Sequence, residues 1–347
     1  MKDIKDLSFI EAKELFTKYG EQPFRAKELF RAIYKNKIRE FANITTFPIH
    51  LRTSLSNDFH IRSFQLASKI TSKDGTEKFL FKLHDKSLIE TVLIKEKNKN
   101  GKTRNTACIS TQVGCPMKCK FCATGQMGFK RNLTTGEIVE QFLTLEDKLP
   151  VQNIVLMGMG EPLINYANTK KAIEIISNSY GRALGRRKIT LSTSGIIDKI
   201  YRLTDEIKSI KLAVSLHSAI QEKRNFLMPG LKDQPLDALN KALNYYSKKT
   251  GNTVTIEYLL INDINDTIKD LRELIRFVRK IKFVKVNLIH FNKVPFIDFE
   301  ASKKEENFLS DLLKSGIRAT LRKSKGTEIS AACGQLATKN NISVNLE

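Results

Sequence analysis

The sequence predicts an α/β protein whose core is a full or partial barrel. Two observations carry this prediction. From residue 107 onward, short strand-like runs alternate with amphipathic helix-like runs, a pattern typical of parallel strands joined by crossover helices. Before them lie a helical stretch and two alternating β-type runs. We therefore expect a helical domain at 1–60, a β-hairpin and basic linker at 61–104, and the barrel core at 105–347.

The first 60 residues favour helices. Ser8 and Glu11 form a potential capping box ahead of an amphipathic run. Pro23 is suited to the start of a second helix, and a third apolar run surrounds Leu51. We expect a small helical accessory domain.

The linker region has a different pattern. Its runs KFLFKL and LIETVLI alternate like strands, and Asp74-Gly75 supplies a hairpin turn. The run KEKNKNGKTR (Lys95–Arg104) is polar and basic. We expect it to form an exposed loop.

The formal charge of +22 comes from 59 Lys and Arg against 37 Asp and Glu. Such an excess favours a polyanionic partner, most commonly nucleic acid, although a generally Lys-rich proteome would also produce it. No apolar run reaches the length of a membrane span, and the N-terminus has no unbroken apolar stretch of a secretory signal. We expect a cytoplasmic protein that does not enter membranes.

Three of the five cysteines, Cys115, Cys119 and Cys122, are spaced C-x3-C-x2-C. Three thiolates on one loop can hold three irons of a [4Fe–4S] cluster and leave the fourth iron open. A structural zinc site is the alternative, and it needs a fourth ligand from Cys108, Cys333 or a histidine.

The segment CPMKCKFCATG, with Phe121 before its last cysteine, resembles the cluster loop of the radical S-adenosylmethionine (SAM) superfamily. The resemblance implies that the open iron binds SAM and that one electron cleaves SAM to a 5′-deoxyadenosyl radical. Around it, CISTQVGCPMKCKFCATGQMGFKRNLTTGEI, NIVLMGMGEPLIN, RRKITLSTSGI, AVSLHS, VTIEYLLI, VNLIHFN and AACGQL occur in order. Over about residues 20 to 340 they resemble the adenine carbon-2 methyltransferases of 23S ribosomal RNA, the RlmN/Cfr group. This implies a partial (β/α)6-type radical SAM barrel and an N-terminal helical domain that contacts the RNA.

The resemblance also implies the site residues. The three cysteines above would bind the cluster, Cys333 and Cys108 would act on the methyl group, and Glu90 would be the general base. The residues that match SAM-binding positions are Gly160, Glu161, Ser192, Ser215, Leu216, His217 and Asn292. Taken singly, a Ser, His or Asn at a strand end is more often a cap or a turn former.

The implied mechanism consumes two SAM molecules per turnover. One methylates Cys333, and the other yields the radical that removes a hydrogen from this methyl group. The methylene radical adds to the adenine, and Cys108 releases the product by forming a disulfide with Cys333. A thiol reductant restores both cysteines. The electron donor would be a low-potential protein such as flavodoxin, and we expect a monomer.

Val113 and Pro162 resemble the carbon-2 branch rather than its carbon-8 sister branch. Lys293 and the run Pro229-Gly230-Leu231 depart from the family pattern near substrate loops. Three alternatives stay open: carbon-8 methylation of the same adenine, transfer RNA as an additional or sole substrate, and a non-catalytic RNA-binding protein with zinc.

Overall fold

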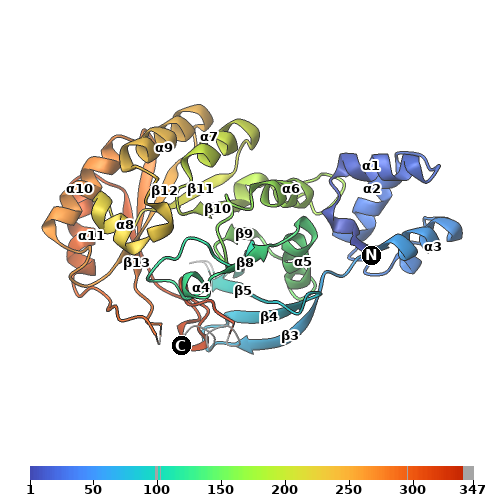
Figure 1. Cartoon of the computed structure of the whole chain (residues 1–347), viewed down its shortest axis with the longest axis horizontal. Coiled ribbons are helices and arrows are strands. Elements are labelled where there is room, and N and C mark those ends of the chain that lie inside the picture. Colours follow the sequence, from blue (N-terminus) through green and yellow to red (C-terminus); the bar gives the residue numbers. More distant parts are fainter. Residues whose placement is uncertain (98–100, 102, 295, 339–347) are drawn as a thin grey trace.

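Ten strands form one sheet in the computed structural model, in the order β14-β13-β12-β11-β10-β9-β6-β5-β4-β3 (Figure 1). The structure describes residues 1–97, 101, 103–294 and 296–338. Within them, β14 pairs only with β13 and β3 pairs only with β4, so the sheet is open. The barrel is therefore partial.

Parallel strands make up the barrel part of the sheet. They are β6 (Thr103–Cys108), β9 (Asn153–Leu156), β10 (Ile189–Thr193), β11 (Lys211–Ser215), β12 (Val254–Leu260), β13 (Val284–His290) and β14 (Ala319–Arg322). The helices that connect them are α5 (Thr135–Glu146), α6 (Tyr166–Ile176), α7 (Ile197–Glu206), α9 (Leu236–Thr250), α10 (Ile268–Arg279) and α11 (Glu305–Lys314). Six β/α units thus precede the last strand, which confirms the predicted alternation.

Local sequence explains where several of these helices begin and end. Thr134 and Glu137 form a capping box at the start of α5, because each side chain binds the other residue's backbone N–H. Thr267 and Asp270 do the same for α10. Helix α9 ends at Gly251, whose φ of +69° suits a residue without a Cβ.

The linker is more than one hairpin. Its strands β3 (Phe64–Thr71), β4 (Glu77–Leu83) and β5 (Leu88–Lys97) are antiparallel and extend the barrel sheet directly through β6. The prediction of a loop at Lys95–Arg104 was wrong at both ends, where the residues belong to β5 and β6. The remainder of that loop, 98–100 and 102, lies outside the described residues.

The N-terminal module is helical, as predicted. The capping box of Ser8 and Glu11 opens its first helix. The helices are α1 (Phe9–Lys18), α2 (Arg25–Phe30), which continues into a π-helical turn, and α3 (Ile49–Asp58); β1 (Lys2–Asp3) pairs with β2 (Phe59–His60). None of the helices among the described residues is long and apolar enough to span a membrane.

A buried charge network joins this module to α5. Lys5 is fully buried, and its Nζ lies 2.9 Å from Asp3 and 3.4 Å from Glu140 of α5. Asp6 accepts a hydrogen bond of 2.7 Å from the backbone N–H of Gly136 at the start of α5. These contacts connect the N-terminal module to the first helix of the barrel.

Candidate active site

The predicted cluster cysteines lie on a loop between β7 (Gln112–Gly114) and the short helix α4 (Ala123–Gln126). The N–H of Cys115 donates a 2.8 Å hydrogen bond to the carbonyl of Gly128. Gly114 has a φ of +75°, and a Cβ there would lie 1.9 Å from that carbonyl oxygen. Only glycine fits at this close approach.

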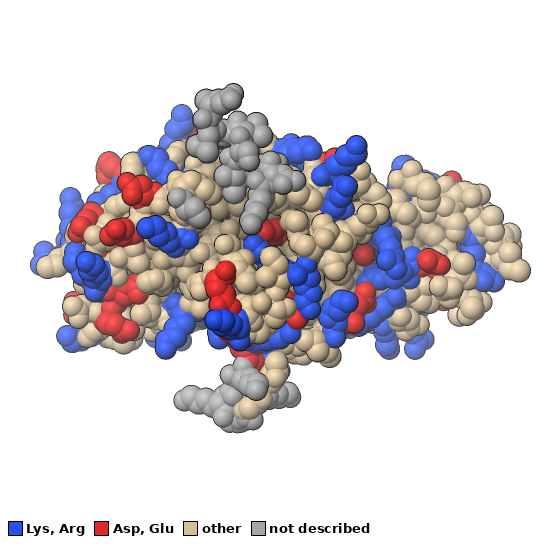
Figure 2. Space-filling view, turned by 90° about the horizontal axis from the view of Figure 1, so that it is seen from below, with Lys and Arg blue, Asp and Glu red and all other residues tan. Residues whose placement is uncertain are grey.

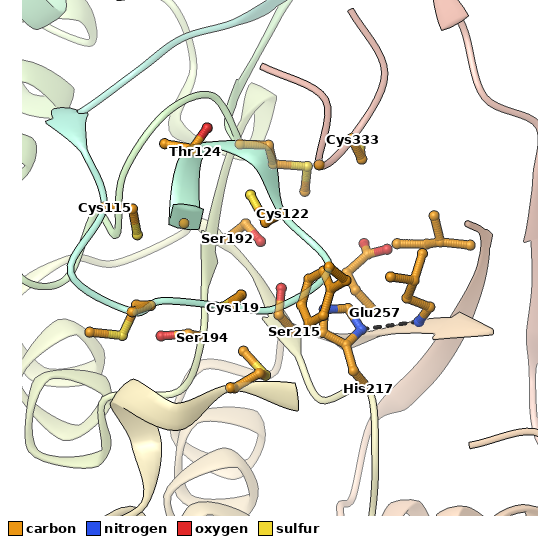
Figure 3. A pocket seen from close by; sticks show the side chains of 18 of the residues that line it. Cys115, Cys119, Cys122, Thr124, Ser192, Ser194, Ser215, His217, Glu257 and Cys333 are labelled. Carbon is orange, nitrogen blue, oxygen red and sulfur yellow. Dashed lines mark hydrogen bonds between the residues drawn. The ribbon is translucent and has the colours of Figure 1, made fainter. Parts of the chain in front are cut away.

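All three thiols line one cavity at the carboxyl ends of the parallel strands, which we call the main cavity (Figure 3). It encloses about 1010 Å³ of space free of atoms, part of it open to solvent. In barrels of β/α units, ligands bind at this end of the strands.

The three thiols are desolvated. Burial raises the pKa of Cys115, Cys119 and Cys122, and cysteine neighbours raise the pKa of the first two further. A bound cation reverses this effect and favours the thiolates. Among the described residues, no three His, Cys, Asp or Glu side chains are close enough to share one metal ion. The three cysteines lie along one loop and line the same cavity (Figure 3), which suits a cluster that takes one thiolate per iron.

Unpartnered polar atoms also face this cavity. Ser194 Oγ, Glu257 Oε2 and Asn292 Oδ1 are buried and have no hydrogen-bond partner within the described part of the chain. Buried polar atoms are normally satisfied by protein, water or a ligand. The wall therefore suits a polar organic cofactor such as SAM next to the cluster.

The structure brings together six of the seven residues predicted to bind SAM. Leu216 is the exception, because it is fully buried and its carbonyl accepts a 2.6 Å hydrogen bond from Arg224. The six that line the main cavity are Gly160, Glu161, Ser192, Ser215, His217 and Asn292.

His217 is held in one orientation and one protonation state. Its Nδ1 accepts a 3.0 Å hydrogen bond from the backbone N–H of Leu259, and its ring packs edge-on against Phe121 with centroids 4.6 Å apart. Burial lowers the pKa of His217 to about 3. The ring is therefore neutral near pH 7 and carries its proton on Nε2.

Glu161 links two strand ends. Its carboxylate accepts hydrogen bonds from Thr193 Oγ1 (2.7 Å), the N–H of Ser194 (2.6 Å) and the N–H of Leu163 (3.0 Å). Burial raises the pKa of this carboxyl group, and the hydrogen bonds oppose that effect. Both oxygens thus have protein donors, so Glu161 positions the turns after β9 and β10 as well as lining the cavity.

Cys333 lies on residues 330–337, the Cys333 loop, which folds back from β14 onto the cluster loop. The N–H of Ala123 donates to the carbonyl of Gly334 (2.8 Å), and Thr124 Oγ1 donates to the carbonyl of Leu336 (2.6 Å). The loop therefore brings Cys333 to the rim of the main cavity, next to α4.

Cys333 also lines a second cavity, together with Cys108. Burial raises the pKa of Cys108 to about 12, and the nearby Cys333 is the next largest cause. Cys333 itself is accessible, yet the protein packed around its thiol raises its pKa while Arg322 lowers it. Both cysteines are free thiols, and the structure places Cys333 close enough to raise the pKa of Cys108.

Glu90 is buried but is not among the residues that line either cavity. One carboxylate oxygen lies 2.9 Å from Lys78 Nζ, and the other accepts a 2.8 Å hydrogen bond from the N–H of Ala337. Burial raises its pKa, and Lys78 opposes this. In this structure the carboxylate anchors the end of the Cys333 loop.

Arg224 was missed by sequence reasoning. It is fully buried on α8 (Gln221–Leu227) and donates to the carbonyls of Ser215 (2.9 Å), Leu216 (2.6 Å) and Ser194 (2.5 Å). Burial lowers its pKa to about 10, so it stays charged. These hydrogen bonds hold the turns after β10 and β11, which line the main cavity. A lone arginine in a polar helix gives no sequence signal of this role.

The segment that follows α8 also holds the cluster loop. The N–H of Lys120 donates to the carbonyl of Leu227 (2.9 Å), and the N–H of Gly230 donates to the carbonyl of Met117 (3.0 Å). A Cβ at Gly230 would lie 2.7 Å from the Met117 oxygen. The departure Pro229-Gly230-Leu231 therefore contacts the cluster loop.

Glu257 was also missed as a site residue, although its motif was recognised. It is 4% exposed, its Oε1 accepts a 3.0 Å hydrogen bond from Asn287, and its Oε2 lies 3.9 Å from Arg322. Burial raises its pKa. Its unpartnered oxygen at the cavity wall can accept a hydrogen bond from a cofactor.

Comparison with known proteins agrees with this geometry. Residues 109–278 match the family model "Radical SAM superfamily", and residues 2–61 match "Ribosomal RNA large subunit methyltransferase N-terminal domain". The chain is 42% identical to the probable dual-specificity RNA methyltransferase RlmN of Cytophaga hutchinsonii, over 97% of this chain and 93% of that protein. It is 44% identical to the protein of that name from Thermotoga maritima, over 98% of both chains.

A solved structure is similar over nearly the whole length. The crystal structure of a radical SAM methyltransferase from Sphaerobacter thermophilus superposes with a TM-score of 0.90 at 38% identity and covers 97% of this chain and 99% of that chain. The family implies a [4Fe–4S] cluster and SAM, which the residues of the main cavity fit. The chain therefore belongs to the RlmN family of radical SAM enzymes.

Proposed function

We propose that this enzyme methylates carbon 2 of a specific adenine in 23S ribosomal RNA, and also the adenine 3′ of the anticodon in transfer RNA. The observation that carries the proposal is the position of Cys333, which lines both cavities. A methyl carrier has to reach both the cofactor and the base. The dual-specificity names of the relatives support the two RNA substrates.

The main cavity would hold both cofactors. Cys115, Cys119 and Cys122 would bind the cluster, and Ser192, Ser215 and Asn292 would be among the SAM contacts. When bound, they would supply the methyl group and a 5′-deoxyadenosyl radical, with two SAM molecules used per turnover and a low-potential donor such as flavodoxin providing the electron. The neutral ring of His217, packed on Phe121, would keep charge away from this part of the wall.

Cys333 is the proposed methyl carrier. Carbon 2 of adenine lies between two ring nitrogens and is electrophilic, so it does not attack a methyl cation equivalent. A thiolate does so readily. The Cys333 sulfur would therefore hold the carbon as a thioether before it reaches the base.

Cys108 is the proposed resolving thiol. Once the adduct has given its carbon-2 proton to a base and its unpaired electron back to the oxidised cluster, the Cys108 thiolate would attack the Cys333 sulfur, and the bond between that sulfur and the methylene carbon on the base would break. The bonding electron pair leaves with the carbon, which takes up a proton and becomes the methyl group. The two sulfurs remain as a disulfide, which an external thiol then reduces.

Two residues near the site favour carbon 2 over carbon 8. Val113 is buried in β7, beside the cluster loop, and Pro162 is buried directly after Glu161. Both match the carbon-2 branch in the sequence. The carbon-8 reaction is the alternative, and the position of the new methyl group decides between them.

Mass spectrometry of digested ribosomal and transfer RNA tests the proposal. Cells that lack the gene are complemented with the wild-type chain, Cys333→Ala, Cys108→Ala, or Ser330→Ala as a control on the same loop. We expect 2-methyladenosine with the wild type and the control and none with Cys333→Ala. Cys108→Ala should accumulate protein covalently bound to RNA. If the wild-type chain gives 8-methyladenosine or no methyladenosine, the proposal is wrong.

The RNA would be bound by basic surface. Figure 2 shows Lys and Arg spread over one face, with several where the N-terminal module meets the barrel. A groove at this junction is lined by Arg62, Lys82 and Lys86. Arg39 also lines it but pairs with Asp147 (2.7 Å) and Glu140 (3.3 Å). We propose that a single copy of the chain acts on each RNA.

A further inference from the structure

The Cys333 loop contains no helix or strand of its own. Residues 331–337 follow η6 (Thr327–Ile329), a single turn of 3-10 helix, without regular secondary structure. The position of the Cys333 sulfur therefore depends on contacts between this loop and the rest of the chain. Asn292 and Thr124 contact the middle of the loop. Its two ends are held from the other side, by the hairpin of β3 and β4 and by β5.

The turn between β3 and β4 holds the segment that leads into the loop. The N–H of Gly326 donates a 3.0 Å hydrogen bond to a carboxylate oxygen of Asp74. In the opposite direction, the carboxylate of Glu328 accepts hydrogen bonds from Ser72 Oγ (2.8 Å) and from the N–H of Lys73. The side-chain partners lie 252 and 256 positions apart in the sequence, so only the tertiary fold brings them together.

The two surfaces fit closely at Gly326. Its φ is +65°, and a Cβ there would lie 2.9 Å from both Thr76 Cγ2 and Ala331 Cβ, so glycine is required. Asp74 also accepts a 2.9 Å hydrogen bond from the N–H of Thr76. Burial raises the pKa of Asp74, but the hydrogen bonds from Thr76 and Gly326 outweigh it and lower the pKa to about 2. The carboxylate is therefore an ionised acceptor at neutral pH.

Lys78 connects the two ends of the loop through Glu90. Its Nζ, on β4, lies 2.9 Å from one carboxylate oxygen of Glu90 on β5, and it donates a 3.2 Å hydrogen bond to the carbonyl of Ser330. The other oxygen of Glu90 accepts the N–H of Ala337 (2.8 Å). The two charged side chains are only 12% and 6% exposed, so water competes little for these contacts. One ion pair thus holds both the first and the last residue of the Cys333 loop.

We propose that the Cys333 sulfur is fixed between the two cavities by a clasp, with Lys78 as its central positioning residue. The clasp consists of Asp74, Lys78, Glu90 and Glu328. This inference goes beyond the proposed function and rests on it only in taking Cys333 as the methyl carrier. Lys78 lines neither cavity, so it acts through the loop. A sulfur that meets two partners needs such support, because a misplacement of about 1 Å can lower a rate about a hundredfold.

Hydrogen exchange of the full chain, with its cluster loaded, tests the role of Lys78. Lys78→Met removes both contacts of the ammonium group and should increase the exchange of residues 331–337 about tenfold. Lys78→Arg keeps a charged donor and should return the exchange to within about twofold of the wild type. Lys69→Met is the matched control, because Lys69 pairs with Glu77 (2.8 Å) across the same two strands. The control should exchange like the wild type at residues 331–337.

Alkylation of Cys333 under native conditions tests whether the thiol itself is released. The protein packed around this thiol raises the pKa of Cys333. Opening the loop exposes the thiol, so Cys333 should be alkylated about threefold faster at pH 7 in Lys78→Met than in the wild type. Lys78→Arg and Lys69→Met should react like the wild type. This rate separates positioning from overall stability, because it is measured on the folded chain.

The end of the clasp at the β3–β4 turn is tested separately. Glu328→Ala removes, from an exposed position, the acceptor for two donors of that turn. It should increase the exchange of residues 326–330 about fivefold. Glu306→Ala removes an exposed acid from α11 and should leave this exchange unchanged. Exchange like that of the wild type in both Glu328→Ala and Lys78→Met would overturn the proposal.

Methylation kinetics connect the clasp to the reaction. Lys78→Met should lower kcat about tenfold and change KM for the RNA less than about twofold, because the loop positions the carrier and does not bind the RNA backbone. If exchange and alkylation change as expected but the wild type makes no 2-methyladenosine, the clasp stands and the proposed function fails. If the wild type makes 2-methyladenosine and Lys78→Met matches it in exchange, alkylation and kcat, the clasp fails and the function stands.

Discussion

The side-chain amide of Asn292 donates a 3.2 Å hydrogen bond to the carbonyl oxygen of Cys333. This hydrogen bond joins the end of β13 to the Cys333 loop, across 41 residues of sequence. The other amide atom, Oδ1, is buried and unpartnered at the wall of the main cavity. One side chain thus faces the cofactor space and also holds the thiol that the cofactor would act on.

Removing this amide should loosen the Cys333 loop. We expect Asn292→Ala to increase hydrogen exchange of residues 331–337 about fivefold, because one hydrogen bond contributes about 1 kcal/mol. Lys293→Ala is the control, since Lys293 accepts a hydrogen bond from Gln335 only through its backbone carbonyl. Equal exchange rates in Asn292→Ala and in the wild type would mean that the loop is held by its other hydrogen bonds alone.

Glu90 offers a test between a proton-accepting role and a positioning role. In Glu90→Gln, the amide oxygen can still accept the hydrogen bond from Ala337, whereas the ion pair with Lys78 is removed. If Glu90 positions the Cys333 loop, methylation should fall less than tenfold in Glu90→Gln and much further in Glu90→Ala. The Glu90→Ala chain should also show faster hydrogen exchange at Ala337.

A proton-accepting role predicts a different pattern. Glu90→Gln would then abolish methylation while the exchange of the Cys333 loop stayed as slow as in the wild type. Glu96→Gln serves as the matched control, because Glu96 lies on the same strand and pairs with the exposed Arg104.

The sequence predicted those features that depend on local pattern. The alternation of strands and helices gave the parallel sheet, and polar residues at strand ends, such as Ser192 and Ser215, met in one cavity because parallel strands place their carboxyl ends together. The capping box at Ser8 needed only two residues three positions apart. Family motifs supplied the link between the cysteine loop and Cys333, which spacing alone could not give.

Features that depend on remote partners were not predictable. The sequence around Glu90 predicts only a strand residue. Its hydrogen-bond partner Ala337 lies 247 positions later, and the fold alone brings the two together. Arg224 reads as a solvated charge on a polar helix, and only the tertiary fold buries it among three carbonyls. The polar run at Lys95–Arg104 reads as a loop because this end of the β5–β6 pair is accessible to solvent and carries few apolar side chains.

Arg224 should be the most sensitive of the missed residues. Arg224→Met leaves the carbonyls of Ser194, Ser215 and Leu216 buried without a donor, which should lower the free energy of unfolding by about 3 kcal/mol. Arg224→Lys keeps one donor group and should have a smaller effect. Chemical unfolding of the cluster-free chain measures both. Arg276→Met, which breaks an exposed pair with Glu273, should change stability by about 0.5 kcal/mol or less; a similarly small effect at Arg224 would contradict the fastening role.

The reactivity of Cys108 should depend on pH in a way that an ordinary thiol does not. Burial raises its pKa to about 12, with Cys333 as the second cause. The thiolate is the reactive form, so less than about one Cys108 in ten thousand is reactive at pH 7. Its alkylation rate should therefore rise about tenfold per pH unit from 7 past 10, whereas a cysteine in the urea-unfolded chain levels off near 9. Mass spectrometry of the digested chain follows each cysteine separately.

Cys333→Ala sharpens this measurement. This substitution removes the second cause of the raised pKa of Cys108 but leaves the thiol buried. The alkylation rate of Cys108 should therefore be higher than in the wild type at every pH below 10. It should still not level off near pH 9. Rates that level off near 9 in the folded wild-type chain would show that the Cys108 thiol is not desolvated. The slow reaction at neutral pH has a consequence for the proposed turnover: Cys108 would attack only after the RNA and the modified Cys333 have changed the surroundings of its sulfur.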